Sequence, residues 1–265
     1  MKPFDLFSLK GKTIVTTGST GGLGTHFVKN LAWAGADIAI LDIAKCEDKL
    51  KTLAEEVEAE YGVKAKGYVI DVSNEEDILR VRTNILKDFG HLDGVLNMMG
   101  INQHGPVSEI SEDDLNRLLK VNVTGTFACC KIFGETLCEQ NSGSIVNIAS
   151  IAASAALRVP RPMSGYTITK AGVVAMTKAI ATEYGAHNVR VNAISPGFME
   201  TRMSGTKGAI PADPAALKRY GLEETPMNRF CKADELTGAA IYFLSDASTF
   251  TTGNNLVIDG GFLLW

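Results

Sequence analysis

Residues 144–170 read SIVNIASIAASAALRVPRPMSGYTITK, which predicts a buried strand, a loop and the start of a helix. Tyr166 and Lys170 are four residues apart, so on a helix their side chains project from one face. A fixed ammonium ~4 Å from a phenol, at an effective dielectric of ~20, favours the phenolate by roughly 4 kcal/mol. That is enough to move a tyrosine pKa from about 10 to about 7. The pair predicts acid–base chemistry, although the same spacing also arises by chance on amphipathic helices.

Length and composition narrow the class of protein. The chain has 265 residues, 45% of them hydrophobic, which suits a single α/β domain over residues 1–265. A net charge of −4 without a basic stripe argues against nucleic-acid binding, and no apolar run approaches the ~20 residues of a membrane span. Five cysteines and four dispersed histidines lack metal-ligand spacing, so we expect no metal site and reduced thiols. We therefore expect a cytoplasmic protein without a secretory signal.

A glycine-rich turn follows the first expected strand, 13–16, and precedes an expected helix over 26–35. Glycine tolerates turn torsions and lets a ligand approach the backbone, while the helix N-terminus offers N–H groups to a phosphate. The spacing is Gly-x-x-x-Gly-x-Gly rather than the common Gly-x-Gly-x-x-Gly, so a purely structural turn is the alternative. We predict a dinucleotide site that includes Gly18, Ser19, Gly22, Leu23 and Gly24.

A second expected strand, 37–41, ends in Asp42, eighteen residues past Gly24. A carboxylate at this place is suited to bind the adenosine ribose hydroxyls of NAD and to repel the 2′-phosphate of NADP. The nearest cation that could offset this repulsion is Lys45. We therefore predict NAD as cofactor, with NADP as the less favoured choice. The alternative is that Asp42 turns away and caps the next helix.

Strands and helices alternate along the rest of the chain, and the strands are continuous apolar runs. Further strands are expected at 65–70, 94–97, 144–148, 189–193 and 255–258. This alternation is typical of a mostly parallel, seven-stranded, doubly wound Rossmann-like sheet with helices on both faces. Ligands bind such folds beyond the carboxyl ends of the strands. Asp71, Ser150 and residues 97–100 all fall at such ends, so we expect them to meet in one crevice.

Two further segments attract attention. Asn122 stands inside an apolar helical stretch that begins after Ser111, where its side chain is either incidental or opens a contact with water or backbone. Residues 203–231 are rich in Gly, Pro and Ala and show little periodicity. A loop this long in a compact domain is typical of a lid. We predict a substrate lid there, mobile without ligand, with apolar contacts from Met203, Leu217 and Leu222.

With these motifs placed, the chain resembles the short-chain dehydrogenase/reductase family over nearly its whole length. The resemblance implies a nicotinamide-dependent oxidoreductase that interconverts a secondary alcohol and a ketone. Tyr166 would move a proton to or from the substrate oxygen, Lys170 would lower the tyrosine pKa and bind the nicotinamide ribose, and Ser150 would hydrogen-bond the carbonyl. Asn122 would hold a water that links Lys170 to solvent. The cofactor positions that the family implies include Asp71 at the adenine, Val72, Asn97, Gly100, Pro196, Gly197, and Thr201 at the nicotinamide amide.

The chain departs from the family pattern in two places. Met98 and Met99 replace the middle pair of the common Asn-Asn-Ala-Gly, and sixteen residues separate Ser150 from Tyr166, a longer span than usual. The Pro-rich insert at 157–162 and the C-terminal sequence DGGFLLW resemble fungal-type polyol dehydrogenases and ketose reductases acting on D-arabinitol, mannitol or sorbose.

The resemblance also implies a homotetramer or homodimer. Two alternatives stay open at this point. One is a gluconate-type sugar-acid dehydrogenase in which Arg158 or Arg161 binds the carboxylate. The other is a non-catalytic dinucleotide-binding protein on the same fold, because fold alone does not prove activity.

Overall fold

A computed structural model of the chain describes residues 3–155, 157, 162–200 and 223–264. The strands are β1 (Thr13–Thr17), β2 (Asp37–Asp42), β3 (Ala65–Val69), β4 (Gly94–Asn97), β5 (Gly143–Ile148), β6 (Val189–Pro196) and β7 (Asn255–Ile258). They form one sheet in the order β3-β2-β1-β4-β5-β6-β7, and every neighbouring pair is parallel. The strand order reverses between β1 and β4, which is the switch point where doubly wound folds bind ligands. The predicted Rossmann-like fold is confirmed.

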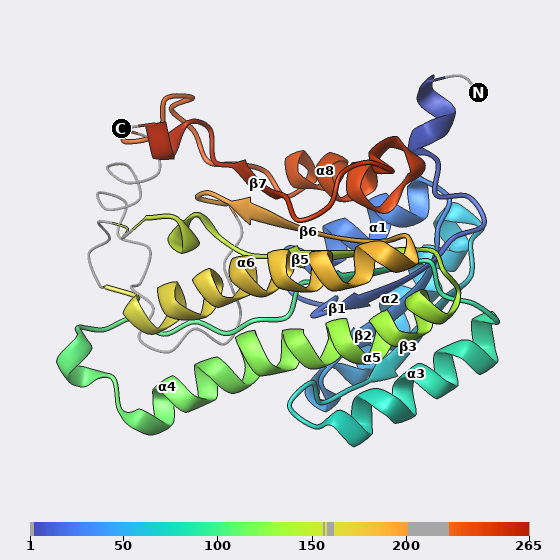
Figure 1. Cartoon of the computed structure of the whole chain (residues 1–265), viewed down its shortest axis with the longest axis horizontal. Helices are drawn as coiled ribbons and strands as arrows, with labels where there is room; N and C mark the ends of the chain where they lie inside the picture. Colours follow the sequence, from blue (N-terminus) through green and yellow to red (C-terminus); the bar gives the residue numbers. More distant parts are fainter. Residues whose placement is uncertain (1–2, 156, 158–161, 201–222, 265) are drawn as a thin grey trace.

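Helices cover both faces of this sheet (Figure 1). The main helices are α1 (Gly24–Trp33), α2 (Glu47–Tyr61), α3 (Glu75–Phe89), α4 (Glu112–Leu119), α5 (Thr126–Glu139), α6 (Ser164–Tyr184) and α8 (Asp234–Leu244). One core cluster joins the sheet to α1, α2 and α8, and a second joins it to α3, α5 and α6. In β1, Ile14 belongs to the first cluster and Val15 to the second, because successive side chains point to opposite faces of a strand.

The helix ends follow local sequence rules. Asn74 caps α3 by accepting a hydrogen bond from Glu76 N at 3.0 Å, and Ser111 caps α4 by accepting one from Asp114 N at 3.1 Å. Gly62 and Gly90 end α2 and α3 in the left-handed region, with φ of 66° and 86°. These short turns return the chain to the next strand.

The single long helix expected after Ser111 is interrupted. α4 and α5 are joined without a break by one π-helical segment, Lys120–Gly125, which contains Asn122. A π turn inserts one residue into the helix and is frequent at functional sites. The interruption places Asn122 toward the carboxyl ends of the central strands, as the hydrogen bonds below show.

Several predictions meet the limits of the described residues. Thr201, Arg158, Arg161 and the part of the expected lid from 203 to 222 lie outside them. Among the described helices, none is long and apolar enough to cross a membrane. Within the same residues, no group of three or more His, Cys, Asp or Glu side chains is placed to hold a metal ion.

Candidate active site

Tyr166 lies in the first turn of α6, directly beside the end of β5. Its side chain is 7% exposed, and its phenol is hydrogen-bonded to the Ser150 hydroxyl. Ser150 follows β5 and opens the 3₁₀ turn Ile151–Ala153, where its Oγ accepts a hydrogen bond from Ala152 N at 3.1 Å. Burial raises the pKa of Tyr166 to about 12, and the hydrogen bond from Ser150 opposes that rise. Two hydroxyls from different elements thus meet at one point.

Lys170 lies one turn further along α6 and is 2% exposed. Its Nζ donates a hydrogen bond to Ile148 O at 2.7 Å and lies 5.7 Å from the centroid of the Tyr166 ring. Burial lowers the pKa of Lys170 to about 8. Desolvation is the largest influence on the pKa of both groups, and the ammonium donates to a carbonyl, so the predicted lowering of the tyrosine pKa by Lys170 stays a prediction. The phenol is protonated at neutral pH, which suits proton donation to a carbonyl oxygen.

Asn122 is fully buried and holds the segment that follows β4. Its Oδ1 accepts a hydrogen bond from Ile101 N at 2.8 Å, and its Nδ2 donates to Ile101 O at 2.8 Å and to Thr169 Oγ1 at 3.0 Å. The carboxamide thus clamps the backbone of Ile101 against α6. The side chain binds backbone and a hydroxyl, and the predicted water link to Lys170 stays a prediction.

The glycine turn requires glycine at two of its positions. Gly18 has φ of +67°, and a Cβ there would lie 2.9 Å from Met99 Cα. A Cβ on Gly24 would lie 2.4 Å from Gly18 O. Real Cβ atoms do not approach backbone this closely, so packing explains both residues. The turn is held tightly against the backbone beyond β4, while α1 begins at Gly24 with Leu23 as its N-cap.

Two other residues of the turn differ in their exposure to solvent. Ser19 is fully buried, its Oγ donates to Thr16 O at 2.8 Å and its backbone N donates to Leu41 O at 3.2 Å, so both groups are engaged within the protein. Gly22 is exposed at the tip of the turn. The free N–H groups at the start of α1 and this exposed tip fit a phosphate group.

Asp42 faces the glycine turn. Its Oδ2 accepts hydrogen bonds from Thr20 N at 2.9 Å and Thr20 Oγ1 at 2.7 Å, and its Oδ1 accepts one from Ile43 N at 2.9 Å. The N-cap of α2 is Cys46, without a side-chain cap, so Asp42 does not cap the following helix. The carboxylate is therefore fixed between the end of β2 and the turn.

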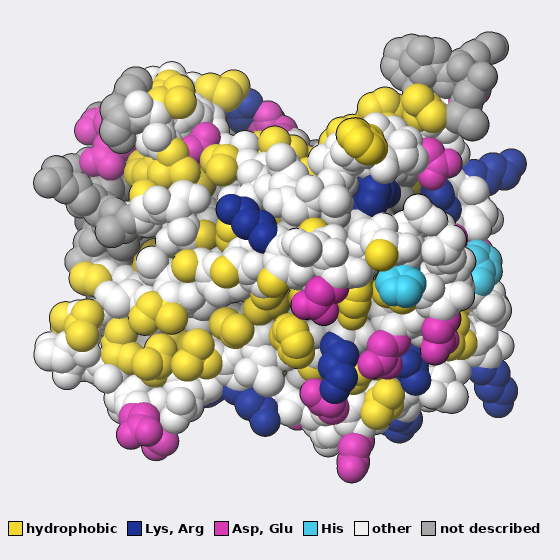
Figure 2. All heavy atoms as spheres, in the orientation of Figure 1, with side chains coloured by type: hydrophobic (Ala, Val, Ile, Leu, Met, Phe, Trp, Pro, Cys, Tyr) yellow, Lys and Arg dark blue, Asp and Glu magenta, His cyan; other side chains and the backbone are white. Residues whose placement is uncertain are grey.

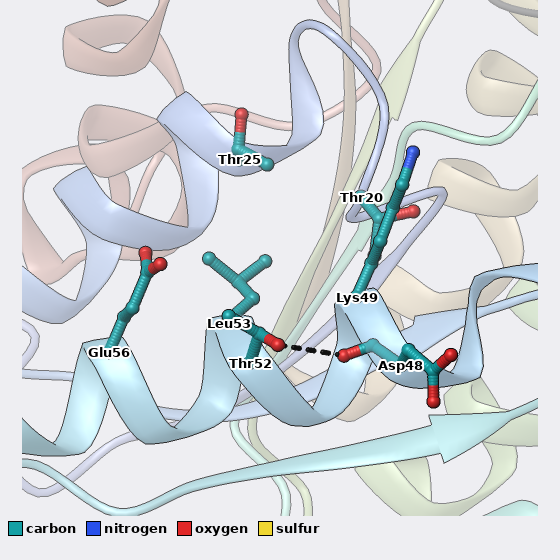
Figure 3. A pocket seen from close by; sticks show the side chains of 7 residues that line it. All are labelled: Thr20, Thr25, Asp48, Lys49, Thr52, Leu53 and Glu56. Carbon is teal, nitrogen blue, oxygen red and sulfur yellow. Dashed lines mark hydrogen bonds between the residues drawn. The ribbon is translucent and has the colours of Figure 1, made fainter.

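A shallow pocket lies beside this carboxylate, between the glycine turn and α2 (Figure 3). It is lined by Thr20, Thr25, Asp48, Lys49, Thr52, Leu53 and Glu56. Figure 3 shows Lys49 extending from the first turn of α2 past Thr20. From the sequence, only Lys45 was expected as a nearby cation. Lys49 could have been found from the apolar spacing of Leu50 and Leu53, which places it on the adjoining, outward face of the same helix.

The predicted residues after β3 and at the end of β4 occupy different environments. Asp71 is exposed, and its Oδ1 accepts from Ser73 N at 2.9 Å, whereas Val72 is buried beside the π-helical segment at Gly125. Asn97 is 2% exposed, and its Nδ2 donates to Asn147 Oδ1 at 2.9 Å. Asn97 thus ties β4 to β5 inside the sheet, so its amide is a structural link between strands.

Gly100 and Gly197 line the same end of the sheet. A Cβ on Gly100 would lie 3.6 Å from Lys170 Nζ, and one on Gly197 would lie 2.7 Å from Asp259 Cα. Pro196 ends β6 just before Gly197. Close packing against Asp259 requires glycine at 197, whereas Gly100 leaves ordinary contact distances to Asn122 and Lys170. The described candidates thus collect at the carboxyl ends of β1, β2, β4, β5 and β6, and their chemistry fits a dinucleotide.

Comparison with known proteins adds independent findings. Residues 18–263 match the protein-family model described as enoyl-(acyl carrier protein) reductase. An NADP-dependent mannitol dehydrogenase from Alternaria alternata is 35% identical over 260 residues, covering 97% of this chain and 94% of that protein. A 2,5-dichloro-2,5-cyclohexadiene-1,4-diol dehydrogenase from Sphingobium indicum is 39% identical over 257 residues, covering 96% of this chain and 98% of that protein. The crystal structure of NAD⁺-bound xylitol dehydrogenase is similar with a TM-score of 0.86 and 32% identity, over 96% of this chain and 99% of that one.

Proposed function

This chain belongs to the short-chain dehydrogenase/reductase family, whose members use a nicotinamide cofactor, and from that premise we propose that it interconverts a polyol and a ketose. The observation that carries the proposal is the meeting of Ser150, Tyr166 and Lys170 at the carboxyl ends of the central strands. All three come from α6 and the end of β5, so packing of one helix on one strand aligns them. The names of the mannitol and xylitol dehydrogenases support the choice of substrate class.

The chemistry follows from the protonation states of the site. In the direction of reduction, the protonated Tyr166 donates its proton to the substrate oxygen while Ser150 donates a hydrogen bond to the same oxygen. Burial raises the pKa of Tyr166 to about 12, so the phenol is protonated at neutral pH and can donate its proton. Lys170 brings a cation close to the phenolate that forms and so stabilises it. When bound, the nicotinamide cofactor supplies or accepts the hydride.

The glycine turn, Asp42 and the backbone at Gly100 and Gly197 would hold the cofactor. We propose that NAD(H) is preferred over NADP(H). A 2′-phosphate would bring about two negative charges toward Asp42, and repulsion at ~5 Å with an effective dielectric of ~20 is on the order of 3 kcal/mol per charge before salt screening. The hydrogen bonds from Thr20 support this choice because they hold the carboxylate at the turn. The relatives differ in their cofactors, since the mannitol dehydrogenase is named NADP-dependent and the xylitol dehydrogenase is NAD⁺-bound.

The ratio of kcat/KM for NADH and NADPH tests this cofactor choice. We expect a preference for NADH of ~10- to 1,000-fold, at 1.4 kcal/mol per factor of ten. Asp42→Ser should narrow or reverse the preference for NADH. Lys49→Gln should lower kcat/KM for NADPH more than kcat/KM for NADH. Lys51→Gln is the matched control, because Lys51 is also exposed on α2 but does not line the pocket. A wild type that prefers NADPH contradicts the proposal.

The substrate class needs a panel of polyols, ketoses and sugar acids assayed with both cofactors. Turnover of polyols or ketoses above sugar acids supports the proposal. A preference for gluconate that collapses in Arg158→Ala or Arg161→Ala supports the sugar-acid alternative. Cofactor binding without turnover of any alcohol or ketone supports a non-catalytic protein.

We also propose a homodimer or homotetramer. Large apolar side chains are exposed on α5 and α6, with Phe127 47% and Ile168 52% exposed. Figure 2 shows hydrophobic side chains gathered on this side of the molecule. Analytical ultracentrifugation of the wild type and of Phe127→Glu tests the proposal, because a charge at such an interface should shift the protein to monomer. The expected cytoplasmic location and the extent of the domain stay predictions.

A further inference from the structure

Residues 100–105 form a strap beside the start of α6, and its two ends lie next to Lys170 and Met163. At one end, a Cβ on Gly100 would lie 3.6 Å from Lys170 Nζ and 3.5 Å from Asn122 Oδ1. At the other end, Gly105 N donates to Pro162 O at 2.8 Å, and Gly105 forms a parallel bridge with Met163, the residue before α6. Asn122 also clamps Ile101 N and O at 2.8 Å each. The strap is thus fixed along its length beside the site.

One hydrogen bond relates the side chains of Asn102 and His104 on the strap. Asn102 Nδ2 and His104 Nε2 lie 3.3 Å apart, which confirms that these two side chains are on the same side. The strap runs from Gly100, beside Lys170, to Gly105, beside Met163, so Asn102 and His104 lie between these two points at the border of the catalytic groups.

Hydrogen bonding fixes the orientation of this pair. Asn102 Oδ1 accepts a hydrogen bond from Gln103 N at 2.7 Å, so the amide nitrogen is the atom that faces His104. An amide nitrogen only donates, hence His104 Nε2 accepts and the ring proton lies on Nδ1. The assignment rests on this bonding pattern. Asn102 is only 7% exposed, so a buried carboxamide sets the tautomer of a histidine at the border of the site.

We propose that Asn102 and His104 form a subsite that recognises substrate hydroxyl groups beyond the reacting carbon. The inference rests on the proposed polyol and ketose function. A hydroxyl both donates and accepts, and carboxamide and imidazole groups can each do the same. A sugar-acid carboxylate would instead call for a cation, and this face of the strap presents none among residues 100–105. The pair therefore favours a neutral, polyhydroxylated substrate.

The test compares Asn102→Leu, His104→Phe and the double variant with the wild type. The measured quantity is the ratio of kcat/KM for a ketose, such as fructose or sorbose, to kcat/KM for cyclohexanone, which has no hydroxyl group. Each single variant should lower this ratio about tenfold or more, because a site built to bind a hydroxyl discriminates by that group. The double variant should lower it little further than one single variant, since the two residues act as one coupled pair.

Matched controls keep the test decisive. His91→Phe changes a histidine before β4, at the opposite edge of the sheet, whose Nε2 lies 3.2 Å from Gly11 O, and it should leave the ratio unchanged. Asn102→Ser is the substitute if Asn102→Leu does not fold, as judged by its melting temperature. NADH binding, followed by fluorescence, should stay within about threefold of the wild type in each folded variant.

Two results would overturn the inference: a ratio within twofold of the wild type in both single variants, or equal losses with fructose and cyclohexanone. A wild type that turns over no polyol or ketose refutes the proposed function itself, which separates the two failures.

Discussion

Replacing Lys170 with methionine should make stability less dependent on pH. The ammonium is 2% exposed, and burial lowers its pKa from 10.5 to about 8. Between pH 8 and 10.5 the folded protein therefore binds fewer protons at this site than the unfolded chain does. Linkage requires the wild type to gain stability as the pH rises through this window. The Lys170→Met variant has no titrating group at this position, so its stability does not rise at this site as the pH increases.

The magnitude follows from the two pKa values. At pH 7 the buried charge costs the folded wild type about 3 kcal/mol, and at pH 10 about 1 kcal/mol. Methionine removes that cost and also leaves Ile148 O without its 2.7 Å hydrogen bond, a loss of ~1–3 kcal/mol at any pH. The variant should therefore equal or exceed the wild type in stability at pH 7. Relative to the wild type, it should lose about 2 kcal/mol between pH 7 and pH 10, or ~4 °C in melting temperature.

Urea unfolding of both proteins at pH 7 and pH 10 measures this change. Tyr166 and the other titrating groups remain in both proteins, so the difference between them isolates Lys170. Lys178→Met is the matched control, since Lys178 is exposed on the same helix and the difference should be the same at both pH values. A difference for Lys170→Met that does not change with pH would refute a buried, depressed ammonium.

Three further predictions concern the phenol and the glycine turn. Tyr166→Phe should lower kcat ~10²- to 10⁴-fold while NADH affinity by fluorescence stays within about threefold, and near-normal turnover would exclude Tyr166 as the proton donor. Alcohol oxidation by the wild type should still rise as the pH increases above 8, because it needs the phenolate and burial raises the pKa of Tyr166 to about 12; a rate that levels off near pH 7 contradicts this. Gly24→Ala should lower the free energy of unfolding by ~1–3 kcal/mol or more, because its Cβ would lie 2.4 Å from Gly18 O; urea unfolding that matches the wild type contradicts the clash.

The sequence predicted the fold well because its signals are local and repeated. Continuous apolar runs such as 13–16 and 144–148 became buried strands at nearly the expected bounds. The interruption at Lys120–Gly125 was not predicted, since a π turn leaves the apolar pattern of the surrounding helix almost unchanged. Its cause is tertiary: the carboxamide of Asn122 must reach Ile101 and Thr169.

The position of the candidate site could also be predicted, because parallel strands bring their carboxyl ends to one edge. The effect of burial on the pKa values of its residues could not be predicted. Helical spacing placed Lys170 beside Tyr166, but only the structure shows that burial dominates both groups and that Ile148 O takes the hydrogen bond of the ammonium. In the same way, the sequence does not predict that the side chain of Asn97 donates to Asn147 on the neighbouring strand, or that the carboxylate of Asp42 accepts from Thr20 in the glycine-rich segment.

The two methionines after β4 show how packing resolves an unusual sequence. Met99 is 8% exposed and joins the core cluster on the α5 side, where its Sδ accepts a hydrogen bond from Thr17 Oγ1 at 2.9 Å. Met98 packs against the cluster on the opposite face of the sheet. Both side chains thus leave the carboxyl edge, and the surface that meets Gly18 is the backbone of these residues. Large side chains are compatible with a dinucleotide site here because alternation along the chain sends them into the two cores.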